Sequence, residues 1–160
     1  MNKPTKNTSI RSMQWKLFLL GFFKIPLIGF TRPKLISLDE KNVSVKIKLN
    51  RRTKNHLNSM YFGALAVGAD IAGGIHVFYF SEILDKKVSF SFKGMNAQFL
   101  QRAESDVYFS SNEGLIIKEA IEESIKTGER INKSIIVNAK NESNEIVATF
   151  EKISSLKVLN

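Results

Sequence analysis

The amino-acid sequence predicts an α+β domain in which a curved antiparallel sheet wraps around one long central helix. Three observations lead to this prediction. Residues 57–81 form a run of small and apolar residues that is long enough for one helix and carries a single formal charge. Segments of alternating apolar and polar residues lie on both sides of this run, as in strands with one buried face. The chain of 160 residues can also bury a full hydrophobic core.

Residues 1–32 are predicted to form a basic tail and an amphipathic helix, and residues 33–160 the sheet domain. Helical spacing over residues 10–24 places apolar side chains on one side: Trp15, Leu19 and Phe22 or Phe23. We expect this helix to dock on the domain, with attachment to a membrane surface as the alternative. A lysine and a proline interrupt the apolar run of residues 17–30, and no small-residue cleavage site follows, which disfavours a signal peptide.

The sheet is predicted from six segments that read as extended or alternate with period two. They are residues 34–38, 43–49, 87–103, 106–110, 130–139 and 145–157. A turn is expected at residues 39–42, a bulge or bend at Gly94, and a further turn in the sequence KNESNE before the last strand.

A second, shorter helix is predicted over residues 113–127. Its apolar residues recur at helical spacing: Ile117, Ala120, Ile121 and Ile125. Gly128 is placed to end it, because glycine adopts the left-handed conformation that commonly closes a helix.

Five small residues are expected to let the central helix approach the strands closely: Gly63, Ala64, Ala66, Gly68 and Ala69. Each glycine costs about 1 kcal/mol of helix propensity relative to alanine, which packing must offset. Burying the charge of Asp70 on such a surface would destabilise the fold, unless the carboxylate has a partner or a function. A membrane span is disfavoured, because a carboxylate near the middle of a bilayer costs about 3 kcal/mol.

Composition excludes several classes of site. The chain has no cysteine, so it can form no disulfide, thiolate nucleophile or cysteine-ligated metal site, which fits a cytoplasmic protein. Two histidines, His56 and His76, leave little for a histidine-based metal site, and we expect no metal. Residues 1–56 carry 13 Lys and Arg against two acids, a balance of +11, and the remainder carries −2. Aromatic residues are not interleaved with these bases, which disfavours nucleic-acid binding.

The sequence NHLNSMYFGALAVGAD, residues 55–70, resembles the hot-dog-fold thioesterases of the phenylacetate-degradation type. Within that superfamily it is most similar to a poorly characterised branch described as a domain of unknown function. The family segment has an Asn, then Gly-Thr or Gly-Ser, then His-Gly-Gly at the helix start, and finally Leu-Ala-Asp or Leu-Ala-Glu. The matching residues here are Asn55, Ser59, Gly63 and Asp70. FLQRA at residues 99–103 is similar to the Tyr-Leu-Arg-Pro-Ala strand of the family, and the resemblance covers residues 33–155.

Three positions depart from the family pattern. Tyr61 occupies the position of the family histidine, Phe62 that of the first glycine and Asn58 that of the preceding glycine. The resemblance implies that this histidine is not the catalytic base, so its replacement is compatible with catalysis. Phe62 narrows the space at the helix start, where the substrate would enter.

The resemblance implies a thioesterase site that contains Asp70, Asn55 and Gly63. A backbone N–H near Gly63 would stabilise the oxyanion, because the helix dipole favours negative charge there. Asp70 would activate water or attack the carbonyl, and Asn55 would orient the water or the carbonyl. Family members build such sites across a subunit interface, so the resemblance implies a homodimer or tetramer.

The expected substrate is an acyl-CoA or acyl-carrier thioester, with coenzyme A as part of the substrate and no separate cofactor. The expected binding residues beside the helix start are Ser59, Tyr61, Phe62, Arg51, Arg52 and Lys54. The three basic residues are candidates to meet the phosphates of coenzyme A.

Each of these residues also has a structural interpretation. Asp70 can serve as an internal hydrogen-bond acceptor, and Asn55 and Ser59 can cap the helix. Gly63 can be a packing glycine, and Tyr61 and Phe62 can belong to the core. The basic residues can form a solvated turn, and both histidines are expected to be structural.

Two functions from different classes therefore follow from the sequence. The first is an acyl-CoA thioesterase with a helix carboxylate. The alternative is a non-catalytic hot-dog module that binds an acyl chain or acts as a dimeric scaffold. A hydratase of the same fold is less favoured, because it would need a histidine beside its aspartate.

Overall fold

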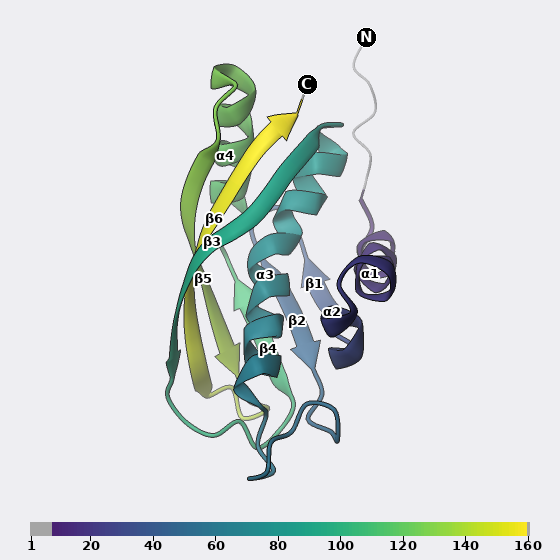
Figure 1. Cartoon of the computed structure of the whole chain (residues 1–160), viewed down its shortest axis with the longest axis vertical. Helices are drawn as coiled ribbons and strands as arrows, with labels where there is room; N and C mark the ends of the chain where they lie inside the picture. Colours follow the sequence, from purple (N-terminus) through teal and green to yellow (C-terminus); the bar gives the residue numbers. More distant parts are fainter. Residues whose placement is uncertain (1–7, 160) are drawn as a thin grey trace.

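A six-stranded antiparallel sheet curves around one long helix in the computed structural model, which describes residues 8–159 (Figure 1). The helices are α1 (Ile10–Leu19), the π-helical turn η1 (Leu20–Lys24), α2 (Pro26–Thr31), α3 (Phe62–Ile83) and α4 (Gly114–Thr127). The strands are β1 (Lys34–Leu38), β2 (Val43–Ile47), β3 (Lys87–Phe99), β4 (Val107–Ser111), β5 (Ile131–Lys140) and β6 (Ile146–Leu159). The predicted fold class is therefore confirmed. Residues 1–7 of the predicted basic tail, and residue 160, lie outside the described part.

The strands follow the order β1-β2-β4-β5-β6-β3, and all neighbours are antiparallel. The order places β3 at one edge, where it pairs with β6 along its whole length. The register of this pair shifts between Phe92 and Gly94, which confirms the bulge expected at Gly94. The other long side of β3 leaves its backbone groups without a strand partner within residues 8–159.

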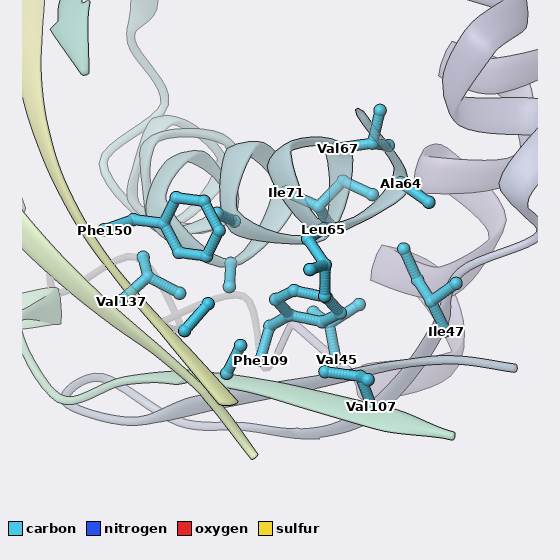
Figure 2. Close-up of a cluster of buried hydrophobic side chains, with 14 of the residues drawn as sticks. Val45, Ile47, Ala64, Leu65, Val67, Ile71, Val107, Phe109, Val137 and Phe150 are labelled. Atoms are coloured by element: carbon cyan, nitrogen blue, oxygen red, sulfur yellow. The ribbon is translucent and has the colours of Figure 1, made fainter. Parts of the chain in front are cut away.

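Helix α3 lies in the concave face of the sheet, and its small residues allow close contact (Figure 2). Gly68 shows the requirement most directly, because a Cβ atom there would lie 2.6 Å from Cδ2 of Phe109 and closer still to other atoms of that ring. Phe109 and Phe150 are buried between the helix and the strands. Gly63 does not contribute to this packing, since its nearest neighbour is the ring of Tyr61.

Helix α4 covers the C-terminal half of α3 and forms a second apolar cluster with β5 and β6. Ile117 and Ile121 are fully buried there against Phe80 of α3. Gly128 ends the helix with φ 72°, the left-handed conformation that the sequence predicted for this position. The predicted second helix is thus confirmed in both place and ending.

The N-terminal helices pack beside α3 and β1 (Figure 1). Helix α1 docks on the domain, as expected, and Met13 and Leu17 are its buried residues in the main core. The predicted docking side was wrong, because Trp15, Phe22 and Phe23 are 60–69% exposed. Gln14 fastens α1 to β1, because its side-chain oxygen accepts a hydrogen bond from the N–H of Leu35 at 2.6 Å. Helix α2 was not predicted, although Pro26 stands at its start, where proline is favoured.

One helix among residues 8–159, α3, is long and apolar enough to cross a membrane by length and composition, with a mean hydropathy of 1.4. More than half of that apolar stretch, 61%, is buried inside the protein by the sheet and the other helices. The apolar character of α3 is therefore accounted for by its place in the core.

Candidate active site

Asp70 lies two turns into α3 and forms an ion pair with Lys152 of β6. Lys152 Nζ donates to Asp70 Oδ1 at 2.5 Å. The two side chains differ strongly in exposure, since 45% of Asp70 but only 4% of Lys152 is accessible. The second carboxylate oxygen, Oδ2, accepts no hydrogen bond from residues 8–159. The structure therefore presents a half-exposed carboxylate that is oriented through one of its two oxygens.

Lys152 is the buried member of this pair. Its ammonium lies 3.7 Å from the centre of the Phe92 ring, where the negative face of the ring attracts a cation. Burial lowers the pKa of Lys152, and the charge and hydrogen bond of Asp70 oppose that decrease. The Asp70 carboxylate and the Phe92 ring thus stabilise the positive charge of Lys152 in its buried position.

A cavity of about 1010 Å³ opens beside Asp70, between the N-terminal helices, α3 and β3. Its walls are mainly apolar, with Leu17 and Leu20 on the N-terminal side and Ile71 and Ile75 on α3. Asp70 is part of the α3 wall. An apolar space with one oriented carboxylate on its wall is suited to a ligand that has an apolar chain and a reactive polar group.

Asn55 and Ser59 close a loop before α3 and do not cap the helix. The Asn55 side-chain oxygen accepts hydrogen bonds from the N–H groups of Leu57 at 2.9 Å and Ser59 at 3.2 Å. Asn55 Nδ2 in turn donates to Ser59 Oγ at 3.1 Å. The helix begins at Phe62 with no side-chain cap, so the capping interpretation of these two residues is wrong.

The first turn of α3 presents backbone donors beside aromatic side chains. Within residues 8–159, the N–H groups of Phe62 and Gly63 make no hydrogen bond. A Cβ atom on Gly63 would lie 2.5 Å from Cε1 of Tyr61, so the ring of Tyr61 lies directly against this glycine. Tyr61 and Phe62 are about half exposed, and Phe62 also contacts Phe99. These two rings therefore stand at the helix start and are not core residues.

The three predicted basic residues lie in the same loop region. Arg51 and Arg52 belong to a turn between β2 and the Asn55–Ser59 loop. The Arg52 guanidinium lies 5.6 Å from the centre of the Phe30 ring, and Lys54 Nζ donates to Asn58 Oδ1 at 3.2 Å. All three are on the end of the molecule where α3 begins.

One chain alone does not bring the predicted catalytic residues together. Gly63 and Asp70 are seven residues apart on one helix, a rise of about 10 Å. Asn55 lies before the helix, and its side chain forms hydrogen bonds within its own loop. The structure instead brings Lys152 to Asp70, a residue that sequence reasoning did not single out. A signal was present, because Lys152 falls in the alternating pattern of β6 on the same side as Phe150 and Ser154, which are buried.

Neither histidine is part of this site. His76 is buried on α3, and its Nε2 donates to the backbone oxygen of Asp39 at 2.9 Å. Burial lowers the pKa of His76, while the hydrogen bond and charge of Asp39 act in the opposite direction. His56 is exposed in the loop before α3.

Comparison with known proteins now places the chain in a family. Residues 15–154 match the family model described as "Domain of unknown function (DUF4442)". The chain belongs to the DUF4442 family. No curated protein matches the sequence.

Solved structures with the same fold are distant in sequence. A Chlorobaculum tepidum protein of unknown function, OLEI01261, is 12% identical with a TM-score of 0.81, over 95% of this chain and 98% of that one. A candidate thioesterase from Shewanella oneidensis is 13% identical with a TM-score of 0.78, over 92% and 99%. The thioesterase HI1161 from Haemophilus influenzae is 12% identical with a TM-score of 0.68, over 97% and 94%. These similarities confirm the hot-dog fold of this DUF4442 protein.

Proposed function

We propose that this protein hydrolyses acyl thioesters and that Asp70 is its catalytic carboxylate. The observation that supports this most directly is the position of Asp70, which is held by a buried lysine and lines a large apolar cavity. Proteins that share the fold and are named thioesterases raise the expectation for this class of reaction.

The proposed chemistry uses the free oxygen of Asp70 as a general base. Oδ2 would accept a proton from water as the water oxygen attacks the carbonyl carbon of the thioester. The C–S bond then breaks, Asp70 gives the proton it took from water to the leaving thiolate, and the thiol and the carboxylic acid are released. Lys152 is a positioning residue in this scheme, because it holds Oδ1 and leaves Oδ2 without a hydrogen bond from residues 8–159 and free to accept a proton.

The oxyanion would be stabilised at the first turn of α3. The free N–H groups of Phe62 and Gly63 point out of a helix start, where the dipole favours negative charge. Since Gly63 and Asp70 of one chain are about 10 Å apart along the helix, the donors would come from a second copy. The proposal therefore includes a homodimer, built through the open edge of β3.

We propose coenzyme A thioesters as the substrate class. Arg51, Arg52 and Lys54 lie at the end of the molecule where α3 begins, and they can contact phosphate groups that enter there. The acyl chain would occupy the apolar cavity that Asp70 lines. Reaction in the cytoplasm is part of this proposal.

The decisive experiment measures thiol release from a panel of short, long and aromatic acyl-CoAs with wild type and Asp70→Asn. Asp70→Asn keeps the shape and removes the base, so the rate should fall by two or more decades, about 2.7 kcal/mol of transition-state stabilisation. Asp106→Asn is the matched control, because Asp106 also pairs with a lysine, Lys46, at 2.8 Å but does not line the cavity. Its activity should remain within a few-fold of wild type.

Two outcomes would contradict the proposal. If Asp70→Asn hydrolyses as fast as wild type, Asp70 is not the catalytic group. If wild type releases no thiol but binds acyl chains, the protein is a non-catalytic acyl-binding module, which the apolar cavity would also suit. Light scattering at micromolar concentration tests the assembly separately and should give about twice the chain mass of 18.1 kDa.

A further inference from the structure

The N-terminal helices expose a continuous row of aromatic rings. We define the aromatic ridge as Trp15, Phe18, Phe22 and Phe23. The centres of successive rings are 5.3, 6.0 and 4.8 Å apart, so each ring contacts the next. Their exposed fractions range from 52% to 69%. An apolar surface of this size on a folded segment indicates contact with another apolar phase or partner.

Packing on the other side of α1 and under the π-helical turn holds the aromatic ridge in place. Met13 and Leu17, on the opposite side of α1, are buried in the core. The π-helical turn closes with a hydrogen bond from the N–H of Ile25 to the oxygen of Leu20 at 2.8 Å. A Cβ atom on Gly21 would lie 2.7 Å from the backbone nitrogen of Gly29, so these glycines permit α2 to pack directly on this turn. The exposure of the four rings therefore results from an ordered arrangement of the backbone.

The segment that carries the ridge has only positive charges. Residues 8–38 contain five basic residues and no acidic one: Arg11, Lys16, Lys24, Arg32 and Lys34. Within residues 8–159, Lys16 is the only one of the five that forms an ion pair, with Glu82 of α3. The other four basic residues are exposed and have no acidic partner in the described part of the chain, and two of them, Arg11 and Lys24, lie on the same helical segment as the ridge.

We propose that the aromatic ridge docks this protein on an anionic phospholipid surface. Aromatic side chains favour the boundary between headgroups and acyl chains, and lysine and arginine bind anionic headgroups from the same position. A contact between two copies of the ridge would instead bring two positively charged segments together, which is unfavourable. The charge thus favours a lipid surface over a second copy of this chain.

Docking in this way would also orient the cavity. Phe23 belongs to the ridge and lines the cavity beside Asp70, as does the neighbouring Lys24. A ligand with an apolar chain could then reach the cavity from the lipid surface. The docking itself does not depend on thioester hydrolysis.

Trp15 provides a built-in probe, because it is the only tryptophan of the chain. Its emission should shift to shorter wavelength when the full chain is mixed with vesicles of equal parts phosphatidylcholine and phosphatidylglycerol, and brominated lipids should quench it. Binding to vesicles of phosphatidylcholine alone should be at least about tenfold weaker. Added salt should weaken binding to the anionic vesicles. The double variant Phe18→Ser/Phe22→Ser keeps the probe and should weaken binding by about tenfold or more.

The control is Leu115→Ser/Ile125→Ser, which removes two exposed apolar side chains of α4, each 43% accessible, and should bind vesicles as wild type does. The charge variant Arg11→Glu/Lys24→Glu should weaken binding to anionic vesicles without changing the rings. Circular dichroism of each variant checks that the fold is retained.

Three results would overturn the proposal. These are failure of wild type to bind anionic vesicles, equal binding by the Phe18→Ser/Phe22→Ser variant, and a Trp15 emission that changes with protein concentration in the absence of lipid. The last result, together with loss of an oligomer in the Phe18→Ser/Phe22→Ser variant, would assign the ridge to a contact between copies of this chain.

Discussion

Two ionisable side chains lie near the middle of α3, six residues apart, and their surroundings are opposite. Asp70 is half exposed, pairs with Lys152 and faces a cavity. His76 is 2% exposed, stacks on Phe80 and donates to a backbone oxygen in the turn before β2. A polar residue in an apolar helix is therefore no sign of function by itself. What distinguishes Asp70 is access to an apolar cavity and orientation by a buried charge.

The largest expected effect is on the free energy of unfolding, when one methyl group is added beside His76 and, for comparison, one is added near Asp70. In Gly114→Ala, the Cβ atom would lie 2.6 Å from Nε2 of His76 and closer still to the backbone oxygen of Glu40. The backbone cannot yield easily, so we expect a loss of about 3 kcal/mol in the free energy of unfolding.

Gly73→Ala is the control on the Asp70 side of α3. Its Cβ atom would lie 3.4 Å from atoms of Phe92 and Val137, an ordinary contact distance. Because alanine is the better helix former, this variant should keep or gain up to about 1 kcal/mol. Urea denaturation measures both. Equal stability of the two variants would contradict the interpretation that the packing around His76 has no room for a methyl group and that the packing near Asp70 has.

A smaller effect concerns the two members of the ion pair. Asp70→Leu leaves the buried ammonium of Lys152 without its acceptor and should cost about 2 kcal/mol, less where the lysine loses its proton. Lys152→Met leaves a half-exposed carboxylate that water can solvate, so its cost should stay below about 1 kcal/mol.

The same pair of variants separates stability from catalysis. Lys152→Met should lower the rate of thioester hydrolysis, because the carboxylate loses its orientation, and should lower the melting temperature by no more than about 4 °C. Asp70→Leu should lower both quantities. A Lys152→Met variant with the wild-type rate would exclude a positioning role for this lysine.

The smallest effect is a dependence of stability on pH that comes from His76. Burial lowers its pKa in the folded state, so the unfolded chain binds a proton that the folded chain does not, from about pH 6.5 down to the folded pKa. The free energy of unfolding should therefore fall as the pH falls through this window, by at most about 1.4 kcal/mol per pH unit.

His76→Gln should flatten this dependence, and urea denaturation between neutral and mildly acidic pH measures it. His56→Gln provides the control, since His56 is exposed in the loop before α3. If wild type and His76→Gln show the same slope, the histidine is not responsible for it.

Sequence reasoning identified most elements of the fold but only part of the candidate site. Asp70 was singled out because a carboxylate stands alone in an apolar helix, and the structure places it at a cavity. Lys152 was missed because a lysine in a strand is usually assigned to the solvated face. Asn55 and Ser59 were placed correctly before the helix, but they bond to each other and to their own loop.

The sequence by itself determined the six strands, α3, α4 and their order, although not α2, because alternation along strands and small residues along a helix act between near neighbours in the chain. It indicated that an N-terminal helix would dock, but it did not identify Met13 and Leu17 as the residues that dock. The tertiary structure alone decided that Lys152 meets Asp70, since these residues are 82 positions apart and meet only when β6 packs over α3. It likewise decided which rings of residues 15–23 remain exposed, because exposure depends on what the rest of the fold leaves uncovered.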